Sequence, residues 1–438
     1  MLSKKNQHLK YYQLLAAGLI MFIAGCAAPG QVSPEISKPQ VLESNRPRAA
    51  IGDVSGNDLE ILADGNTQFT FDIYQQLQSQ PGNLFYSPYS ISSALAMTYV
   101  GAEGSTAEEM ASVLHFMLGQ ENLHSTFNAL DQKLDSLADL EIPKGQGDPF
   151  QLNIANAIWG QQDFHFEDDF LDTLAENYGA GLRLLDYVSQ PEESRLAINQ
   201  WVSDETKEKI QDLIPQGNIT PDTRLVLSNA IYFKATWSEQ FEKGLTEKGI
   251  FYGLKGEEIP AQMMQTGHDS SFRYLKEDGY QVVELPYIGN QVSMLVVVPD
   301  QGRFEEFEDQ FSIEEFSHIL DGLSYSPVAL TFPKFEFETE ISLAEILTGM
   351  GMPTAFSDAA DFSGMTGSKD LFISNVFHKA FVSVDEEGTE AAAATAVEMS
   401  LTSMPESPIE LTVDRPFLFL IREHETGTVL FIGRVVNP

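Results

Sequence analysis

The chain has 438 residues with 64 acidic and 26 basic side chains, a formal net charge of -38 and one cysteine. This length allows a large hydrophobic core in one or two domains. The acidity argues against a nucleic-acid partner, because phosphate recognition depends on clustered lysine and arginine. A single cysteine excludes a disulfide within the chain.

Residues 1–25 have the pattern of a secretory signal peptide. Three lysines precede an apolar run over residues 14–25, which is too short to span a bilayer. The run leads into Ile-Ala-Gly-Cys, ending at Cys26, and this motif resembles the lipobox of bacterial and archaeal lipoproteins. The resemblance implies a lipidated Cys26 that anchors the protein to the outer membrane or cell surface. The alternative is an ordinary secreted protein in which Cys26 has no such role.

Residues 26–60 predict a disordered tether after the lipidated cysteine. After Cys26 the stretch contains four prolines, few large apolar residues and no periodicity. From residue 61 onward, no proline-rich or glycine-rich break divides the chain. Residues 61–438 are therefore predicted to form one α+β domain.

Three helices are expected near the start of this domain. Apolar residues at every fourth position predict a helix over residues 67–79. Ser87 can cap a second helix, the proline that follows it suits the first helical position, and Gly101 can end it. Thr106 and Glu109 have the spacing of a capping box, which predicts the start of a third helix.

The middle and end of the chain predict strands. Residues 225–233 and 292–298 are long apolar runs rich in β-branched and aromatic side chains, as in interior strands. Residues 417–421 and 429–432 are apolar runs on either side of a Glu-Thr-Gly turn, which predicts a C-terminal hairpin.

The stretch over residues 386–403 contains no catalytic group, yet its pattern fits two structures. At period two from Thr389, one face carries compact or apolar side chains, and both Glu390 and Glu398 fall on the other face. That alternation is typical of a strand with one buried face. Alanine and glutamate also favour helices, so local preference leaves the segment undecided. Such a segment suits a conformational switch.

The usual enzyme motifs are missing from the sequence. It has no Gly-x-Ser-x-Gly elbow, no phosphate-binding glycine loop and no His-Glu-x-x-His pair. No catalytic residue, cofactor or metal site is therefore expected. His378 follows two apolar residues and is predicted to be a buried, hydrogen-bonded histidine rather than a ligand or base.

Five stretches resemble motifs of the serpin family, and they occur in serpin order. They span residues 83–92, 223–234, 360–365, 386–403 and 414–419. The resemblance covers nearly everything after residue 67. It implies an α+β serpin fold with three β-sheets, eight or nine helices and an exposed reactive-centre loop over about residues 386–410.

In serpins, a protease attacks this loop as a substrate and forms an acyl-enzyme. The freed part of the loop then enters the main sheet as a new strand and deforms the protease before water can release it. The resemblance thus implies a monomeric inhibitor, not an enzyme, whose partners are serine proteases bound as covalent acyl complexes. The hinge of the loop is of the inhibitory type and consists of Glu386, Glu387, Gly388, Thr389, Glu390, Ala391, Ala392, Ala393 and Ala394.

Counting the usual seventeen positions from Glu386 places the scissile bond between Thr402 and Ser403, within one or two residues. A β-branched residue of modest size before the bond suits a protease with a small apolar primary pocket. The expected target is elastase-like, with subtilisin-like proteases as the second choice.

Other matched positions imply supporting roles. The serpin shutter, which controls opening of the sheet, corresponds to Ser87, Ser90, Asn229 and His378. The serpin breach, at the base of the loop, corresponds to Trp237, Lys334 and Glu386. The alternatives are core packing for Trp237 and a solvated, weakly stabilising pair for Lys334 with Glu386.

Two further expectations concern partners. Heparin-binding serpins carry basic residues where this chain has residues 121–140, but here Lys133 is nearly alone among acidic residues, so heparin is not expected to bind. A non-inhibitory serpin acting as a binding or carrier protein is the alternative function. A third possible function is that of an enzyme on an unrelated fold.

Overall fold

The structure is a computed structural model that describes residues 39–52, 54–139, 142, 150–389 and 407–438. Its folded unit spans Ser37–Pro438 and has the predicted α+β composition. The α-helices are α1 (Gly56–Leu77), α2 (Pro88–Tyr99), α3 (Gly104–Val113), α4 (Gln120–Ser136), α5 (Asp168–Tyr178), α6 (Pro191–Glu205), α7 (Phe304–Gln310), α8 (Ile313–Gly322), α9 (Ala344–Met350) and α10 (Ser363–Thr366). The described residues thus contain ten α-helices rather than eight or nine, of which α10 is a single turn.

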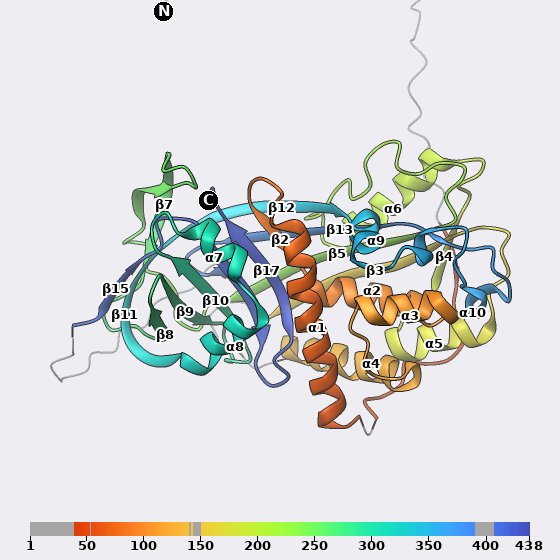
Figure 1. The fold of residues 1–438 in the computed structure, drawn as a ribbon, viewed down its shortest axis with the longest axis horizontal. Helices are drawn as coiled ribbons and strands as arrows, with labels where there is room; N and C mark the ends of the chain where they lie inside the picture. Colours follow the sequence, from red (N-terminus) through yellow and green to blue (C-terminus); the bar gives the residue numbers. More distant parts are fainter. Residues whose placement is uncertain (1–38, 53, 140–141, 143–149, 390–406) are drawn as a thin grey trace, which may run out of the picture. The chain divides into compact units, whose positions relative to one another are not determined.

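The main sheet has seven strands. In spatial order they are β1 (Gln40–Leu42), β4 (Leu182–Leu185), β3 (Gln151–Gln161), β5 (Leu225–Thr236), β14 (Gly388–Thr389), β13 (Ile373–Val384) and β12 (Phe335–Ser342). In Figure 1, the labelled strands β12, β13, β5, β3 and β4 lie side by side. Strands β5 and β13 also pair directly with each other.

The other strands form one continuous hydrogen-bonded system of ten strands. Its members are β2 (Leu84–Tyr86), β17 (Val429–Val435), β16 (Phe417–Glu423), β10 (Val292–Pro299), β9 (Tyr280–Pro286), β8 (Ser271–Glu277), β11 (Ser324–Pro333), β7 (Glu258–Gln265) and β6 (Glu247–Tyr252), with β15 (Ile409–Thr412) pairing to β11. The first half of β11 pairs with β8 and its second half with β7 and β15. Because β11 is shared in this way, the predicted second and third sheets join into one system.

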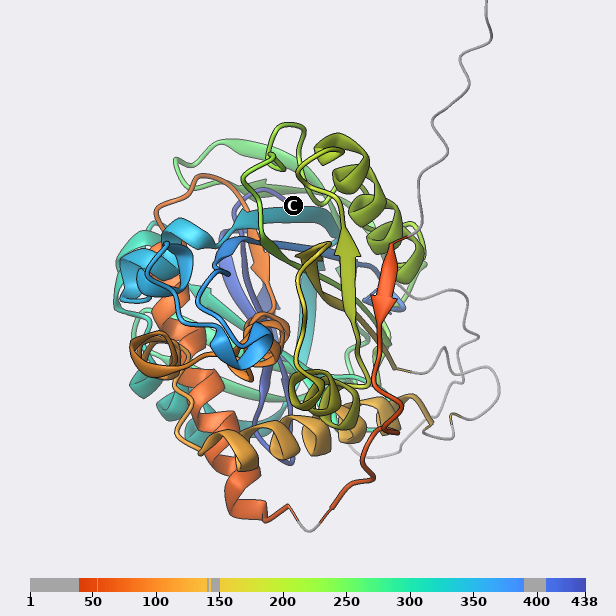
Figure 2. The same cartoon turned by 90° about the vertical axis from the view of Figure 1, so that its right-hand side faces the viewer.

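Strand β5 separates two hydrophobic clusters. Leu227 and Ile231 face the main core, which includes residues of α2 and of the ten-stranded system. Val226 and Ala230 face the opposite side and pack in a second cluster with Ile198 of α6. Figures 1 and 2 show α6 and α2 on opposite faces of the main sheet. Both faces of β5 are buried, which explains its continuous apolar sequence.

The predicted strands and the second helix are confirmed. Strands β5 and β10 cover the two apolar runs, and β16 and β17 form the C-terminal hairpin. Helix α2 begins at Pro88, and the Ser87 side chain caps it by accepting a hydrogen bond from the Ser90 N–H. The first helix is also present, but it begins at Gly56 because Ser55 caps it by accepting from the Asp58 N–H.

The predicted capping box at Thr106 and Glu109 is wrong. Helix α3 has Glu103 at its N-cap, and no side chain caps it. The Thr106 hydroxyl instead accepts a hydrogen bond from the Asp361 N–H (2.9 Å), and the Glu109 carboxylate accepts one from the Thr354 N–H (2.9 Å). The two side chains that the local pattern assigned to the cap therefore bond to backbone N–H groups that are distant in sequence.

The segment before α1 is attached to the folded unit. Strand β1 pairs antiparallel with β4 at the edge of the main sheet, as Figure 2 shows. Beyond it, Arg48 contacts Asp131 of α4, and the Asn128 side chain donates to the Ala49 carbonyl (2.9 Å). The folded unit thus includes residues that precede residue 61. Within the described part of the chain, no helix is both long and apolar enough to cross a bilayer.

Candidate functional site

The site begins where β5 and β13 meet. These strands pair in parallel from Leu225 with Ile373 to Tyr232 with Phe381, and we call this pairing the seam. Beyond Tyr232, the two strands separate and β14 lies between them, antiparallel to both. Thr389 pairs with Ala235 on one side and Val384 on the other. The start of the hinge thus already occupies the position of an additional strand, which the sequence had not predicted.

Close packing surrounds both residues of β14. Thr389 is completely buried, and its hydroxyl lies 2.8 Å from the Tyr287 hydroxyl. The Tyr287 ring in turn stacks on Trp237, with ring centroids 4.5 Å apart. A Cβ atom at Gly388 would lie 2.1 Å from the Ala235 carbonyl oxygen, so only glycine fits there.

The three residues predicted for the breach come together around the turn that precedes β14. Lys334 contacts Glu386 (2.5 Å), which also accepts a hydrogen bond from the Thr246 hydroxyl (2.7 Å). The Trp237 indole donates to the Asp385 carbonyl (3.1 Å). Burial opposes ionisation of Glu386, but the hydrogen bonds from Lys334 and Thr246 outweigh it and lower the pKa of this carboxyl.

A second acidic side chain of the hinge is held in a similar way. The Glu387 carboxylate is 5% exposed and pairs with the ammonium group of Lys243, which is 60% exposed. Lys243 was not among the residues predicted from the sequence, because no local pattern distinguishes it from other surface lysines. Two consecutive buried glutamates are thus neutralised by lysines from different parts of the chain.

The four residues predicted for the shutter form one hydrogen-bonded cluster. The Ser87 N–H donates to Nε2 of His378 (3.3 Å), so this nitrogen carries no proton and Nδ1–H donates to the Asn229 side-chain oxygen. The Asn229 amide donates to the Ser90 hydroxyl (2.6 Å). Complete burial lowers the pKa of His378 to about 3, so the ring is neutral. The contact between His378 and Asn229 crosses the seam.

Asn156 on β3, which was not predicted from the sequence, joins the shutter cluster. Its side-chain oxygen accepts hydrogen bonds from the Asn229 amide and from the Ser90 hydroxyl (3.2 Å). Its amide donates to the Ser90 carbonyl (3.1 Å). The only signal in the sequence is an asparagine within a largely apolar strand, which points to a buried polar partner without naming it.

The outer face of the seam is covered by the segment after α6. The Lys209 ammonium lies 5.9 Å from the centroid of the Tyr232 ring and 5.6 Å from that of Phe381. These two rings belong to the last residue pair of the seam. Lys379 of β13 donates to the Gln211 carbonyl (2.9 Å). Opening of the seam therefore requires these contacts to change.

The remaining predicted site residues lie outside the described residues. They are Cys26, Glu390, Ala391, Ala392, Ala393, Ala394, Thr402 and Ser403. Their roles stay predictions.

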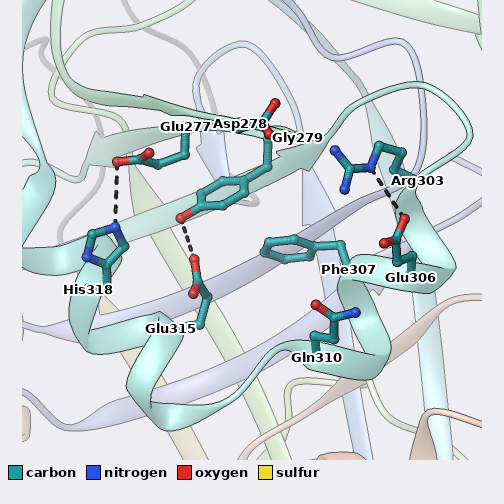
Figure 3. Close-up of a pocket in the computed structure, with 10 residues that line it drawn as sticks. Glu277, Asp278, Gly279, Arg303, Glu306, Phe307, Gln310, Glu315 and His318 are labelled. Atoms are coloured by element: carbon teal, nitrogen blue, oxygen red, sulfur yellow. Dashed lines mark hydrogen bonds and ion pairs between the residues drawn. The ribbon is translucent and has the colours of Figure 1, made fainter.

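A separate pocket lies between α7, α8 and the turn that joins β8 to β9 (Figure 3). Its volume is about 350 Å³. Six of its side chains form three polar pairs: Glu277 with His318 (3.5 Å), Arg303 with Glu306 (3.4 Å), and Tyr280 with Glu315. A lining of this kind does not favour an apolar ligand. In the part of the chain that the structure describes, the residues capable of binding metal form no group that could hold an ion.

The sequence is similar to a known protein family and to both named and uncharacterised relatives. The family model described as serpin (serine protease inhibitor) matches residues 64–438. An uncharacterised serpin-like protein of Thermococcus kodakarensis is 37% identical over 434 residues, 97% of this chain and 98% of the relative. The leukocyte elastase inhibitor of Xenopus laevis is 38% identical over 388 residues, 87% of this chain and all of the relative (100%).

Solved structures show the same fold. A serpin described as highly specific, from the insect Tenebrio molitor, superimposes with a TM-score of 0.76 at 30% sequence identity. The match covers 88% of this chain and 100% of the insect protein. The predicted fold is therefore confirmed, and the chain belongs to the serpin family of serine protease inhibitors, which are not enzymes.

Proposed function

We propose that this serpin inhibits a serine protease as a suicide substrate, by inserting its cleaved loop between β5 and β13. The observation that carries the proposal is β14, which is antiparallel to both neighbours at the end of the seam. Parallel pairs are slightly less stable than antiparallel ones, and insertion replaces one parallel pairing with two antiparallel pairings. The path for a new strand therefore begins at Thr389.

The register of β14 predicts where each later residue goes. Thr389 pairs with Ala235 and Val384, and an antiparallel strand moves one residue back on each neighbour per step. Six residues on, position 395 (389 plus 6) meets position 229 (235 minus 6) and position 378 (384 minus 6). Thr395 would thus enter between the two shutter side chains that contact each other across the seam.

Alternation along the strand supports the same proposal. Thr389 faces the main core, where its hydroxyl meets Tyr287, so residues at odd positions would follow it onto that face. Those residues are small, apolar or hydroxylated, whereas Glu390 and Glu398 fall on the other face. The fourteen residues from Thr389 to Thr402 would extend about 45 Å along the sheet. A protease acylated at Thr402 would be carried to the far end of this strand.

Movement of this kind stops the protease between its two chemical steps. Hydrolysis of the acyl-enzyme requires an aligned oxyanion hole and a correctly placed general base. A protease that is pulled against the body of the inhibitor loses this alignment after acylation. The bound enzyme therefore stays covalently attached.

We expect an elastase-like protease to form a covalent complex by cleaving between Thr402 and Ser403. A threonine before the bond suits a small apolar primary pocket. Denaturing electrophoresis after incubation with elastase would show a band that survives boiling, and mass spectrometry of the released peptide would locate the bond. Quantitative cleavage without such a band would contradict inhibition and favour a binding or carrier function. A cut outside residues 401–404 would contradict the target assignment alone.

Substituting Thr395 tests the predicted register. In the inserted state of Thr395→Val, the side chains of Asn229 and His378 would lose a hydrogen-bonding partner between them. We expect the cleaved form to be destabilised by about 1–3 kcal/mol, while the intact form is unchanged. Thr395→Ser keeps the hydroxyl and serves as the control. Thermal unfolding of intact and cleaved samples measures both effects, and equal effects of Val and Ser on the cleaved form would contradict this register.

We also propose that Cys26 is lipidated and anchors the inhibitor to the outer membrane or cell surface. The support is the lipobox resemblance at the end of an apolar run. In a bacterial host, the full-length protein should partition into detergent, and Cys26→Ser should move it to the aqueous phase. Identical partitioning of the two proteins would contradict lipidation at this residue.

A further inference from the structure

The chain reverses sharply between β13 and β14. Val384, the last residue of β13, pairs with Thr389, and the Asp385 N–H donates to the Gly388 carbonyl (2.9 Å). Residues 385–388 therefore form a tight turn, and the geometry of this turn determines which residue of the hinge lies opposite Val384.

The Asp385 carboxylate holds this turn from within. Its Oδ1 atom accepts hydrogen bonds from the Glu387 N–H (2.9 Å) and the Gly388 N–H (3.2 Å). In many four-residue turns, the fourth N–H donates to the first carbonyl. Here the side chain supplies the acceptor, as aspartate does in an Asx-turn. The Asp385 carbonyl instead accepts from the Trp237 indole (3.1 Å).

The segment after β5 fixes the outside of the turn. The backbone N–H of Trp237 donates to the Glu387 carbonyl (2.9 Å), and the backbone N–H of Phe241 donates to the Glu386 carbonyl (3.0 Å). The turn is therefore attached to the end of β5 on one side and is continuous with β13 on the other. These are the two strands between which the loop would insert.

Register matters because the side chains of a strand alternate. A slip of one residue would move every inserted side chain to the opposite face of the sheet. Glu390 and Glu398 would then face the main core in place of Thr389 and the residues at odd positions. An unpaired buried carboxylate is strongly unfavourable, so a slipped strand would stall early.

We propose that Asp385 is a positioning residue for loop insertion, because its carboxylate sets the turn that places Gly388 and Thr389 in register between β5 and β13. This inference rests on the proposed inhibitory function. In this role Asp385 acts through the backbone N–H groups of Glu387 and Gly388. Its effect is to start insertion in a register that keeps both glutamates out of the core.

Three substitutions separate the position of the acceptor from its charge. Asp385→Asn keeps an oxygen at the same place, Asp385→Ala removes it, and Asp385→Glu keeps the charge but moves the oxygen by one methylene. The ratio of cleaved inhibitor to trapped complex with elastase should rise about fivefold in the alanine variant, the effect of losing about one net hydrogen bond. In the asparagine variant this ratio should stay near the ratio of the unsubstituted protein, and in the glutamate variant it should rise.

Hydrogen exchange of the uncleaved protein provides a readout that needs no protease. The Glu387 and Gly388 amides should be protected in the unsubstituted protein and in Asp385→Asn, and should exchange faster in Asp385→Ala and Asp385→Glu. The proposal would be overturned if Asp385→Ala and Asp385→Glu left both the amide protection and the ratio of cleaved inhibitor to trapped complex unchanged. It would also be overturned if Asp385→Asn were as impaired as Asp385→Ala. If the unsubstituted protein traps no protease, the inhibitory function fails, and exchange still decides whether Asp385 sets the turn.

Discussion

Thr389→Arg is expected to convert the inhibitor into a substrate. The Thr389 side chain is already completely buried against Tyr287 in the uncleaved protein, so an arginine at this position would place an unpaired charge in the core or force the start of the hinge out of the sheet before insertion begins. Such a charge costs several kcal/mol, and each 1.4 kcal/mol slows a step tenfold, so the trapped fraction should fall below about a tenth of the unsubstituted protein's. Electrophoresis with elastase measures trapped and cleaved inhibitor in the same lane.

The matched control is Thr389→Ser, which keeps the hydroxyl that meets Tyr287. We expect the serine variant to trap protease nearly as well as the unsubstituted protein. Cleavage of the arginine variant should remain fast, because its loop still presents the same scissile bond. A normal yield of covalent complex from Thr389→Arg would show that insertion does not depend on a small, uncharged side chain at this position, and would contradict the prediction.

Asn156→Ala should clearly destabilise the uncleaved protein. Among the shutter-cluster residues outside β5 and β13, which are Ser87, Ser90 and Asn156, we expect the largest loss of stability at Asn156. The alanine removes an acceptor for Asn229 and Ser90, and a donor to the Ser90 carbonyl. Polar groups that lose their partners in a buried site cost about 1–3 kcal/mol, so we expect a decrease in the free energy of unfolding of about 2 kcal/mol. Urea unfolding of the intact protein measures it.

Asn153→Ala on the same strand is the control for this experiment. The Asn153 amide nitrogen is buried without a hydrogen-bonding partner among the described residues, so its removal relieves an unsatisfied group. The same substitution should therefore change stability far less at Asn153 than at Asn156. Equal losses at both positions would contradict a special role for Asn156 in holding β3, β5 and α2 together.

Local patterns predicted the elements whose signals lie within a few residues. Ser87 caps α2 as expected, and the apolar runs became β5 and β10. The capping box at Thr106 failed because its hydroxyl bonds to Asp361, which is distant in sequence. Strand β1 has only three residues and is held by pairing with β4, so neither its length nor its periodicity could identify it.

For the candidate site as well, the sequence predicted some residues and missed those that depend on contacts between distant parts of the chain. The family resemblance predicted the shutter and breach positions, and the structure shows hydrogen bonds from His378 to Asn229 and from Asn229 to Ser90, and an ion pair between Lys334 and Glu386. The resemblance did not identify Asn156 or Lys243, because each acts through a partner on another strand or segment. Entry of Gly388 and Thr389 into the sheet depends on how far β5 and β13 separate, which is a property of the assembled sheet.

We propose that a kinetic barrier holds the intact fold above a more stable arrangement in which the loop is a strand. Comparing thermal unfolding of the intact protein with that of protein cleaved once in the loop tests this claim directly. If the loop inserts, the cleaved protein should melt well above the intact protein. If both melt at the same temperature, insertion does not occur and this account of inhibition is wrong.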